Sequence, residues 1–227
     1  MLVKKYKSEV ISISNPIEGV YTLKLAPQKG RFKYSPGQFL HLAIDDSYDG
    51  VGQWPDSRCF SLQSNTNEEN IRITYAVKGK FTREMEQTLT TGSEVWLKLP
   101  YGELFSQSHE KTKVVFIAGG TGITPFLSLF TDASFGEYIS PKIYLGFKTE
   151  KYNIYEHELN LVRSNSYTIA MLLEDIDGKL DIRSIFSDNG TDASYFISGP
   201  PVMITTFKSK LKKYGVPSNN IYTDDWE

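Results

Sequence analysis

Residues 118–126, AGGTGITPF, place three glycines and a proline directly after the apolar run KVVFI. Glycines at 119, 120 and 122 allow a backbone to come close to a ligand, and the N–H groups at a helix start attract phosphate. Pro125 suits a first helical turn because it lacks an N–H that would be unpaired there. The stretch therefore predicts a phosphate-binding loop, with a bare turn as the alternative. The dinucleotide fingerprint GxGxxG is not met, since Pro125 occupies its third glycine position.

Two other segments combine residue types that suit a ligand site. In ISGPPVMI, residues 197–204, Gly-Pro-Pro cannot lie inside a strand and makes a stiff entry into a following helix. In RCFSLQS, residues 58–64, strand geometry puts Arg58 and Phe60 on one face and Ser61 on the other. Taken singly, the first segment also fits a rigid turn, and the second also fits a surface arginine beside a core phenylalanine.

The elements that hold these segments change character along the chain. Up to about residue 100, short alternating runs separated by turn residues predict an antiparallel barrel or sandwich with one helix. The predicted strands are 6–14, 20–26, 38–44, 57–64, 70–77 and 93–99, and the helix is 80–89. From about residue 112, buried-type strands alternate with helices, which predicts a parallel sheet covered on both faces. These strands are 113–120, 142–147, 167–173 and 195–200, and the helices are 124–133, 153–162, 181–188 and 201–214.

This pattern predicts two domains, 1–105 and 112–227, joined by a linker over 106–112. The 227 residues suffice for two small cores, and 40% apolar residues with a net charge of −2 are typical of a globular protein rather than a nucleic-acid binder. Cys59 is the only cysteine, which excludes an internal disulfide or an all-cysteine cluster. No signal peptide and no run of about 18 apolar residues is seen, so we expect a cytoplasmic protein with no membrane insertion.

Several residues that suggest metal or thiol chemistry are expected to be ordinary. His41, His109 and His157 lack ligand-like spacing, so no metal site is predicted. Cys59 has no plausible base near it in the sequence and is interpreted as a small core residue. The acidic segment 45–50, DDSYDG, lacks the spacing of a calcium loop and is interpreted as a solvated turn.

Together, RxFS in a barrel, GGTGITP at the start of a parallel domain and GPPVM at its last strand resemble the ferredoxin–NADP reductase family of flavoenzymes. The similarity covers essentially the whole chain. The fold it implies is an antiparallel Greek-key β-barrel that binds FAD, followed by a doubly wound α/β domain that binds NAD(P)H. The family's barrel motif is R-x-Y-S/T, and here Phe60 replaces the tyrosine.

The resemblance assigns roles within the barrel. Arg58 would pair with the flavin phosphate, for which a guanidinium is well shaped, Phe60 would stack on the flavin ring and Ser61 would lie near flavin N5. The stretch ITYAVKGKFTREM resembles the family's next flavin segment, with Thr82 expected at a helix N-cap. It is shorter than in many relatives, and FAD is preferred over FMN. The cofactor-binding candidates of the barrel are Arg58, Cys59, Phe60, Ser61, Tyr75, Val77, Lys78, Lys80, Phe81 and Thr82.

The resemblance also assigns roles to the second domain. The loop at 120–124 would hold the pyrophosphate of the nicotinamide dinucleotide, and the loop at 199–203 would shape the nicotinamide pocket. Ser198 stands where the family commonly has cysteine, so Ser61 and Ser198 are the catalytic candidates. Trp226 or Tyr222 would cover the flavin, with a frayed tail as the alternative. The cofactor-binding candidates here are Gly120, Thr121, Gly122, Thr124, Glu174, Gly199, Pro200, Met203 and Trp226.

The loop after the third parallel strand bears on coenzyme choice. Glu174 and Asp175 would accept a ribose hydroxyl and repel a 2′-phosphate, which favours NADH, whereas Lys148 and Lys179 favour NADPH.

By resemblance, a hydride passes from the nicotinamide to flavin N5, and electrons then pass to a separate acceptor protein such as a ferredoxin or an oxygenase component. One alternative is a reductase that uses free flavin as a diffusible substrate, and another is a non-catalytic regulatory subunit.

Overall fold

The computed structural model describes residues 2–163 and 167–224. The chain divides into two compact units, residues 1–103 and 104–227. Each unit carries its own apolar core. Among the described residues, no helix has the length and apolar character needed to cross a membrane.

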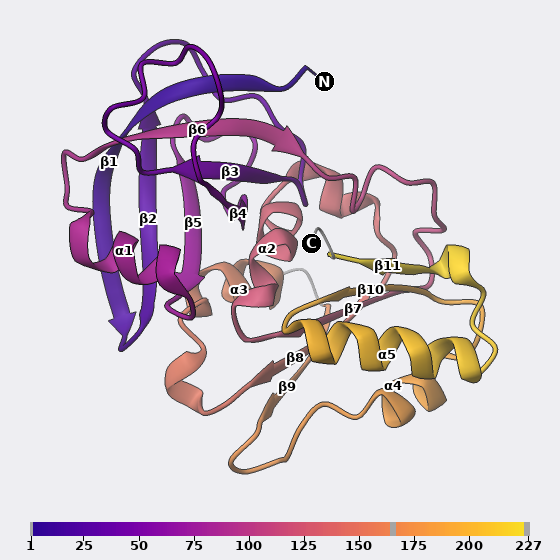
Figure 1. Cartoon of the computed structure of the whole chain (residues 1–227). Helices are drawn as coiled ribbons and strands as arrows, with labels where there is room; N and C mark the ends of the chain where they lie inside the picture. The colour runs from indigo at the N-terminus through magenta and orange to yellow at the C-terminus, as the bar shows by residue number, and fades with distance from the viewer. Residues whose placement is uncertain (1, 164–166, 225–227) are drawn as a thin grey trace. The chain divides into compact units, whose positions relative to one another are not determined.

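The first unit is an antiparallel sheet that curls into a nearly closed barrel (Figure 1). Its elements are β1 (Lys4–Ile17), β2 (Val20–Pro27), β3 (Phe39–Ala43), β4 (Arg58–Ser61), β5 (Ile71–Ala76), α1 (Lys80–Thr88) and β6 (Glu94–Tyr101). The strand order is β4-β3-β6-β1-β2-β5. The two end strands approach each other, since the N–H of Gln63 donates to the carbonyl of Arg72 at 2.9 Å. Alternate residues point inward, as the alternating sequence predicts.

The second unit is a parallel sheet with helices on both faces. Its strands are β7 (Val114–Gly119), β8 (Lys142–Phe147), β9 (Thr168–Leu173), β10 (Ser194–Ser198) and β11 (Ile221–Thr223), and its helices are α2 (Thr124–Phe130), α3 (Glu156–Arg163), α4 (Ile182–Asn189) and α5 (Pro201–Lys213). The strand order is β11-β10-β7-β8-β9. Short 3₁₀ turns lie at Gly120–Ile123, Ala133–Glu137, Glu150–Tyr152 and Ser218–Asn220.

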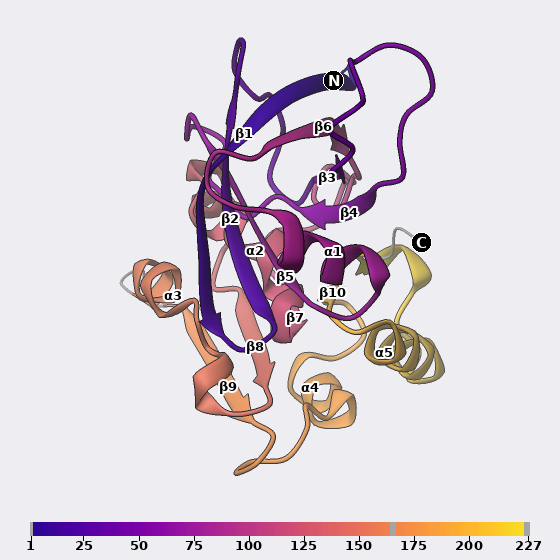
Figure 2. The same cartoon turned by 60° about the vertical axis from the view of Figure 1, so that its left-hand side comes forward.

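The apolar run of β7 supplies both faces of this sheet. Phe116 packs in a core with residues of α2 and α3, whereas the adjacent Ile117 packs in a core with residues of α4 and α5. Figures 1 and 2 show these two pairs of helices on opposite faces of the sheet. A strand buried on both sides must be apolar at every position, which explains the unbroken run VVFIA. The predicted fold class, a barrel followed by a doubly wound sheet, is confirmed.

The C-terminal segment contains a strand that the sequence pattern did not predict. β11 pairs in parallel with β10, and Tyr222 is only 6% exposed. Its ring stacks on Phe196 with centroids 4.5 Å apart. The alternative role of Tyr222 as a flavin cover is therefore wrong, because its ring is packed inside the second unit. Trp226 lies outside the described residues.

The segment predicted to be a linker is fastened to the second unit through His109. Its Nδ1–H donates to the Gln107 carbonyl at 2.7 Å, so Nε2 accepts from the Tyr138 hydroxyl at 2.9 Å. The ring also meets Phe196 edge-on at 4.8 Å. Burial lowers the pKa of His109, the Gln107 carbonyl acts in the opposite direction, and Lys111 lowers the pKa further. The imidazole is therefore held in its neutral form.

We expect this arrangement to make the fold acid-sensitive. The pKa of His109 is lower in the folded chain than its unfolded value of about 6.5. The contribution of His109 to the free energy of unfolding is therefore fully present above about pH 6.5 and is lost as pH falls through the folded pKa. In urea unfolding at about pH 7.5 and about pH 5.5, His109→Gln should lose less stability on acidification than the parent chain. The exposed His157, changed to Gln, is the control. Equal losses in the parent and His109→Gln would contradict this account.

Candidate functional site

Arg58 begins β4 and is the centre of the first candidate site. Its Nη1 donates to Asp56 Oδ1 and to the Ser57 carbonyl, both at 2.7 Å. Its guanidinium carbon lies 5.3 Å from the centre of the Phe81 ring, which is buried at the start of α1. The arginine is half exposed, with a side-chain exposure of 54%. The structure thus brings Arg58 to the start of α1, next to the segment predicted to bind phosphate.

The start of α1 is cationic and carries no acidic residue in its first turn. Lys78 and Lys80 are exposed there. The N-cap is Gly79, so the predicted N-cap role of Thr82 is wrong. The Thr82 hydroxyl instead accepts from the N–H groups of Lys78 at 3.0 Å and Gly79 at 3.1 Å. A helix start with exposed cations and Arg58 nearby has the charge that suits a phosphate.

The aromatic and aliphatic candidates of the barrel are largely buried. Phe60 is 8% exposed and Tyr75 is 4% exposed, and their ring centroids are 5.7 Å apart. Burial raises the pKa of the Tyr75 hydroxyl, which keeps it protonated. Val77 packs against the same core, whereas Ser61 is half-buried at the end of β4. Ser61 is thus less buried than Phe60 and Tyr75.

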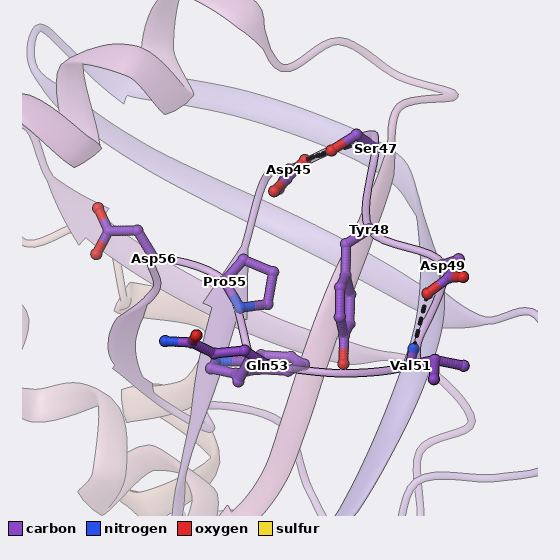
Figure 3. A pocket seen from close by; sticks show the side chains of 9 residues that line it. Asp45, Ser47, Tyr48, Asp49, Val51, Gln53, Pro55 and Asp56 are labelled. Carbon is purple, nitrogen blue, oxygen red and sulfur yellow. Dashed lines mark hydrogen bonds between the residues drawn. The ribbon is translucent and has the colours of Figure 1, made fainter.

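The long loop between β3 and β4 forms an open hollow of about 490 Å³, and Asp56, the partner of Arg58, is among its lining residues. Asp45 binds the N–H and hydroxyl of Ser47, and Asp49 accepts from the Val51 N–H at 2.9 Å (Figure 3). These are local turns, as interpreted from the sequence. Within residues 2–163 and 167–224, no group of three or more His, Cys, Asp or Glu side chains is placed to hold a metal ion.

The second candidate site lies where the strand order of the parallel sheet reverses. β7 is flanked by β8 and by β10, so the loops that follow β7 and β10 meet at the switch point of the sheet. Ligands of doubly wound sheets bind at this position. The two loops are the glycine segment 119–122 and the Gly-Pro-Pro segment 199–201, which lie far apart in the sequence. The structure therefore brings the glycine loop and the Gly-Pro-Pro loop together at one edge of the sheet.

The glycines of these loops have different roles. A Cβ on Gly122 would lie 2.4 Å from the Gly199 Cα, so Gly122 permits the close approach of the two loops. A Cβ on Gly199 would lie 2.7 Å from Met203 Cε, and Gly199 has a φ of +152°. Gly120 has a φ of +56°, and a Cβ there would meet nothing within 4 Å. Gly120 therefore leaves space beside the backbone, whereas Gly122 packs against the Gly199 loop.

Other candidates line the same edge of the second sheet. Thr124 is buried and donates to the Thr121 carbonyl at 3.0 Å, which fixes the turn into α2. Pro200 precedes α5 as its N-cap. Met203 packs against Gly119, since a Cβ there would lie 2.9 Å from the Met203 sulfur.

Ser198 has a partner, Asp224, that the local sequence does not indicate. Its hydroxyl donates to Asp224 Oδ2 at 3.1 Å, and the Asp224 N–H donates to the Ile197 carbonyl at 3.0 Å. Asp224 reaches this position because β11 pairs with β10. No local pattern marks Asp224, so only the pairing of these two strands reveals it.

Glu174 stands at the carboxyl end of β9, within an exposed loop. It pairs with Lys179 at 3.2 Å. The N–H of Leu173 donates to Asp177 Oδ2 at 2.9 Å, which closes the loop on itself. The edge of the sheet therefore presents a carboxylate whose charge is partly offset by one lysine.

Cys59 is not the small core residue that the sequence suggested. It is half-buried on the outer face of the barrel, and its sulfur lies 3.6 Å from Nε2 and 3.7 Å from Nδ1 of His41. The two residues are cross-strand partners between β4 and β3. The base that is missing from the local sequence is supplied by strand pairing.

The fold has counterparts among solved structures. A ferredoxin NADP⁺ reductase from Neisseria gonorrhoeae, solved with bound FAD and NADP, superposes with a TM-score of 0.80 at 14% identity and covers 98% of each chain. The chain has the ferredoxin reductase-like two-domain fold. No protein-family model matches the sequence.

Relatives in sequence carry names from the same class of electron-transfer proteins. The reductase component of propane 2-monooxygenase from Rhodococcus jostii is 26% identical over 243 residues, which cover 98% of this chain and 64% of that protein. The electron transfer subunit of dihydroorotate dehydrogenase B (NAD(+)) from Clostridium acetobutylicum is 27% identical over 218 residues, which cover 94% and 80%. The chain thus spans about two thirds of the first of these proteins. The relatives and structural neighbours are ferredoxin reductase-like flavoprotein reductases, as the motifs predicted.

Proposed function

We propose that this chain is an NAD(P)H-dependent flavoprotein reductase, with FAD on the first unit and the nicotinamide dinucleotide on the second. The observation that carries the proposal is the meeting of the loops at 119–122 and 199–201 at the switch point of a parallel sheet. The names of the relatives and the ferredoxin reductase-like fold support the same reading.

The residues of the first unit fit the phosphate end of a flavin nucleotide. Arg58, Lys78 and Lys80 supply positive charge, and the first turn of α1 supplies N–H groups. Ser61, half-buried at the end of β4, would place its hydroxyl near the flavin ring. When bound, the flavin supplies the chemistry that the side chains lack, since it accepts a hydride and releases electrons singly.

The residues of the second unit fit a dinucleotide. Gly120 and Thr121 would bind the pyrophosphate, while Gly199, Pro200 and Met203 would shape the nicotinamide pocket. Ser198, oriented by Asp224, would place a small polar group beside the nicotinamide. These assignments require side chains only to bind and orient.

We extend the proposal to NADH as the preferred coenzyme, because Glu174 stands at the edge where the adenosine ribose of a dinucleotide lies in such sheets. Glu174→Gln should lower the ratio of kcat/KM for NADH to that for NADPH by about 5–10-fold, since the repulsion of a 2′-phosphate is removed. Steady-state kinetics with both coenzymes test this. Asp188→Asn, an exposed acid on α4, is the matched control. If the ratio of kcat/KM values for the two coenzymes is unchanged in Glu174→Gln, the adenosine ribose does not lie next to Glu174.

We further propose that the electrons leave to a separate protein. The monooxygenase relative is named as a reductase component, and the dihydroorotate dehydrogenase relative as an electron transfer subunit. A cytoplasmic location stays a prediction of the sequence.

A second candidate is a reductase that takes free flavin as a substrate. The observation that favours it is the partial occupation of the flavin site by protein groups: Arg58 is already paired with Asp56, and Phe60 is buried. Such a site would bind flavin weakly, which suits exchange.

Absorption spectra of the purified protein, before and after anaerobic addition of NADH or NADPH, distinguish these functions. A yellow protein that is bleached by NADH supports the reductase with bound FAD. A colourless protein that reduces added flavin with saturation supports the second candidate. A yellow protein that neither coenzyme bleaches would overturn the nicotinamide site.

A further inference from the structure

The strand β9 lies at the end of the sheet in the second unit and has an open edge. It pairs with β8 alone and is the last strand of that sheet (Figure 1). Its sequence, TIAMLL, contains no charged residue and no proline. Natural sheets usually protect such an edge with a short strand, a charge or a proline. The strand at the opposite edge, β11, has three residues, whereas β9 has six and lacks these features.

The hydrogen bonds at the end of β9 show which of its backbone groups face outward. The Glu174 N–H donates to the Phe147 carbonyl on β8 at 2.8 Å. Along a parallel strand, successive residues direct their N–H and C=O groups to opposite sides. Every second residue before Glu174 therefore also faces β8, and the residues between them face away from it. These outward-facing residues are Ile169, Met171 and Leu173.

The turn after β9 closes one end of the edge. The Leu173 N–H donates to Asp177 Oδ2 at 2.9 Å, and the Leu173 carbonyl accepts from the N–H groups of Ile176 at 3.0 Å and Asp177 at 2.7 Å. The outward groups of Leu173 are therefore used within the turn. Those of Ile169 and Met171 have no protein partner in the part of the chain that the structure describes.

The loop beyond this turn does not cover the edge. A Cβ on Gly146 of β8 would lie 2.9 Å from Leu180 Cδ1, so Leu180 packs over β8. The loop thus crosses the face of the sheet towards α4 instead of following its edge.

The side chains of β9 add apolar surface on both faces of the open edge. Ile169 and Met171 pack at the border of the core shared with α2 and α3. By the alternation of a strand, Ala170 and Leu172 lie on the other face of the sheet. All residues from 169 to 173 are only half-buried, although each is apolar. The open backbone groups are therefore flanked by apolar side chains that a neighbouring strand would cover.

We propose that the β9 edge is an interaction surface for a second copy of this chain. The two β9 strands run antiparallel about a two-fold axis at Ala170, so the two sheets continue as one. Ile169 exchanges both of its outward hydrogen bonds with Met171 of the second copy, and Met171 does so with Ile169. This register uses the outward groups that lack a partner in the single chain. The surface does not depend on the reductase function.

The side chains fit the same register. On one face, Ile169 lies opposite Met171 of the second copy, which makes an apolar cross-strand pair. On the other face, the two Ala170 residues lie opposite each other at a non-hydrogen-bonded position, where antiparallel strands are closest and a small side chain fits. A register shifted toward the carboxyl end would need the outward groups of Leu173, which already bond within the turn.

Sedimentation velocity of the full chain from about 1 µM to about 200 µM tests the proposal. The paired segment is short, so we expect a dimer with a Kd in the micromolar range. In hydrogen–deuterium exchange, residues 168–173 should be better protected at the higher concentration, because the N–H groups of Ile169 and Met171 become bonded. A parent protein that is monomeric at about 200 µM would overturn the proposal and leave the edge to a strand of another protein.

A charge on the two-fold axis tests the register. Ala170→Lys should raise the Kd of the dimer at least about 30-fold, because two like charges would face each other across the axis. Ala26→Lys, at a half-buried alanine of β2 in the first unit, is the matched control and should dimerise as the parent does. Urea unfolding checks that both variants fold.

The exchange measurement on the parent protein decides the result even if Ala170→Lys does not fold. A dimer that forms without added protection of residues 168–173 would overturn the proposal, because its interface would lie elsewhere. A folded Ala170→Lys variant that dimerises as the parent does would overturn the placement of the axis at Ala170.

Discussion

Replacing Gly122 with alanine is expected to destabilise the second unit by about 2–3 kcal/mol and to weaken NADH binding more than tenfold. The added Cβ would lie 2.4 Å from the Gly199 Cα and 2.5 Å from the Gly199 nitrogen. Both are backbone atoms, so no rotamer change relieves the contact, and the two loops must separate. Urea unfolding and quenching of tryptophan fluorescence by NADH measure the two effects.

Gly136→Ala is the matched control for this variant. Gly136 lies in the same unit, and a Cβ there would meet nothing within 4 Å. Its unfolding free energy and NADH affinity should match those of the parent. A Gly122→Ala protein with parent-like affinity and stability would show that the loops do not need their close approach.

Replacing Arg58 with alanine is expected to lower FAD affinity about 10–100-fold. A charge-assisted hydrogen bond to phosphate contributes about 1.5–3 kcal/mol, and each 1.4 kcal/mol is about a factor of ten in affinity. Equilibrium dialysis of the apoprotein against FAD measures the change. Asp56→Asn should act in the opposite direction and raise affinity several-fold, because its carboxylate occupies the same guanidinium nitrogen.

The control for Arg58→Ala is Arg31→Ala, an exposed arginine in the loop between β2 and β3. It should bind FAD as the parent does. If the Arg58→Ala variant binds FAD with the affinity of the parent protein, the flavin phosphate does not bind at the start of α1. If Asp56→Asn also left affinity unchanged, the pairing with Arg58 would have no part in flavin binding.

Local patterns in the sequence predicted the order of the two units and every strand and α-helix except β11. Alternation along 20–26 and an unbroken apolar run at 114–118 follow from whether a strand has one buried face or two. Such periodicity is local, so these elements were predicted to within about three residues of their observed bounds. The glycine and proline loops were also readable, because few other residues fit a tight turn between a strand and a helix.

Contacts between residues of different elements could be seen only in the folded chain. Gly122 faces Gly199 because the order of strands puts β7 beside β10, and Asp224 reaches Ser198 because β11 pairs with β10. Cys59 meets His41 through the register of two antiparallel strands, which the local sequence does not record. Strand neighbours and register depend on the packing of the whole sheet, and a shift of one residue moves every side chain to the other face. The contact of Cys59 with His41 and the close approach of Gly122 to Gly199 were therefore beyond local patterns.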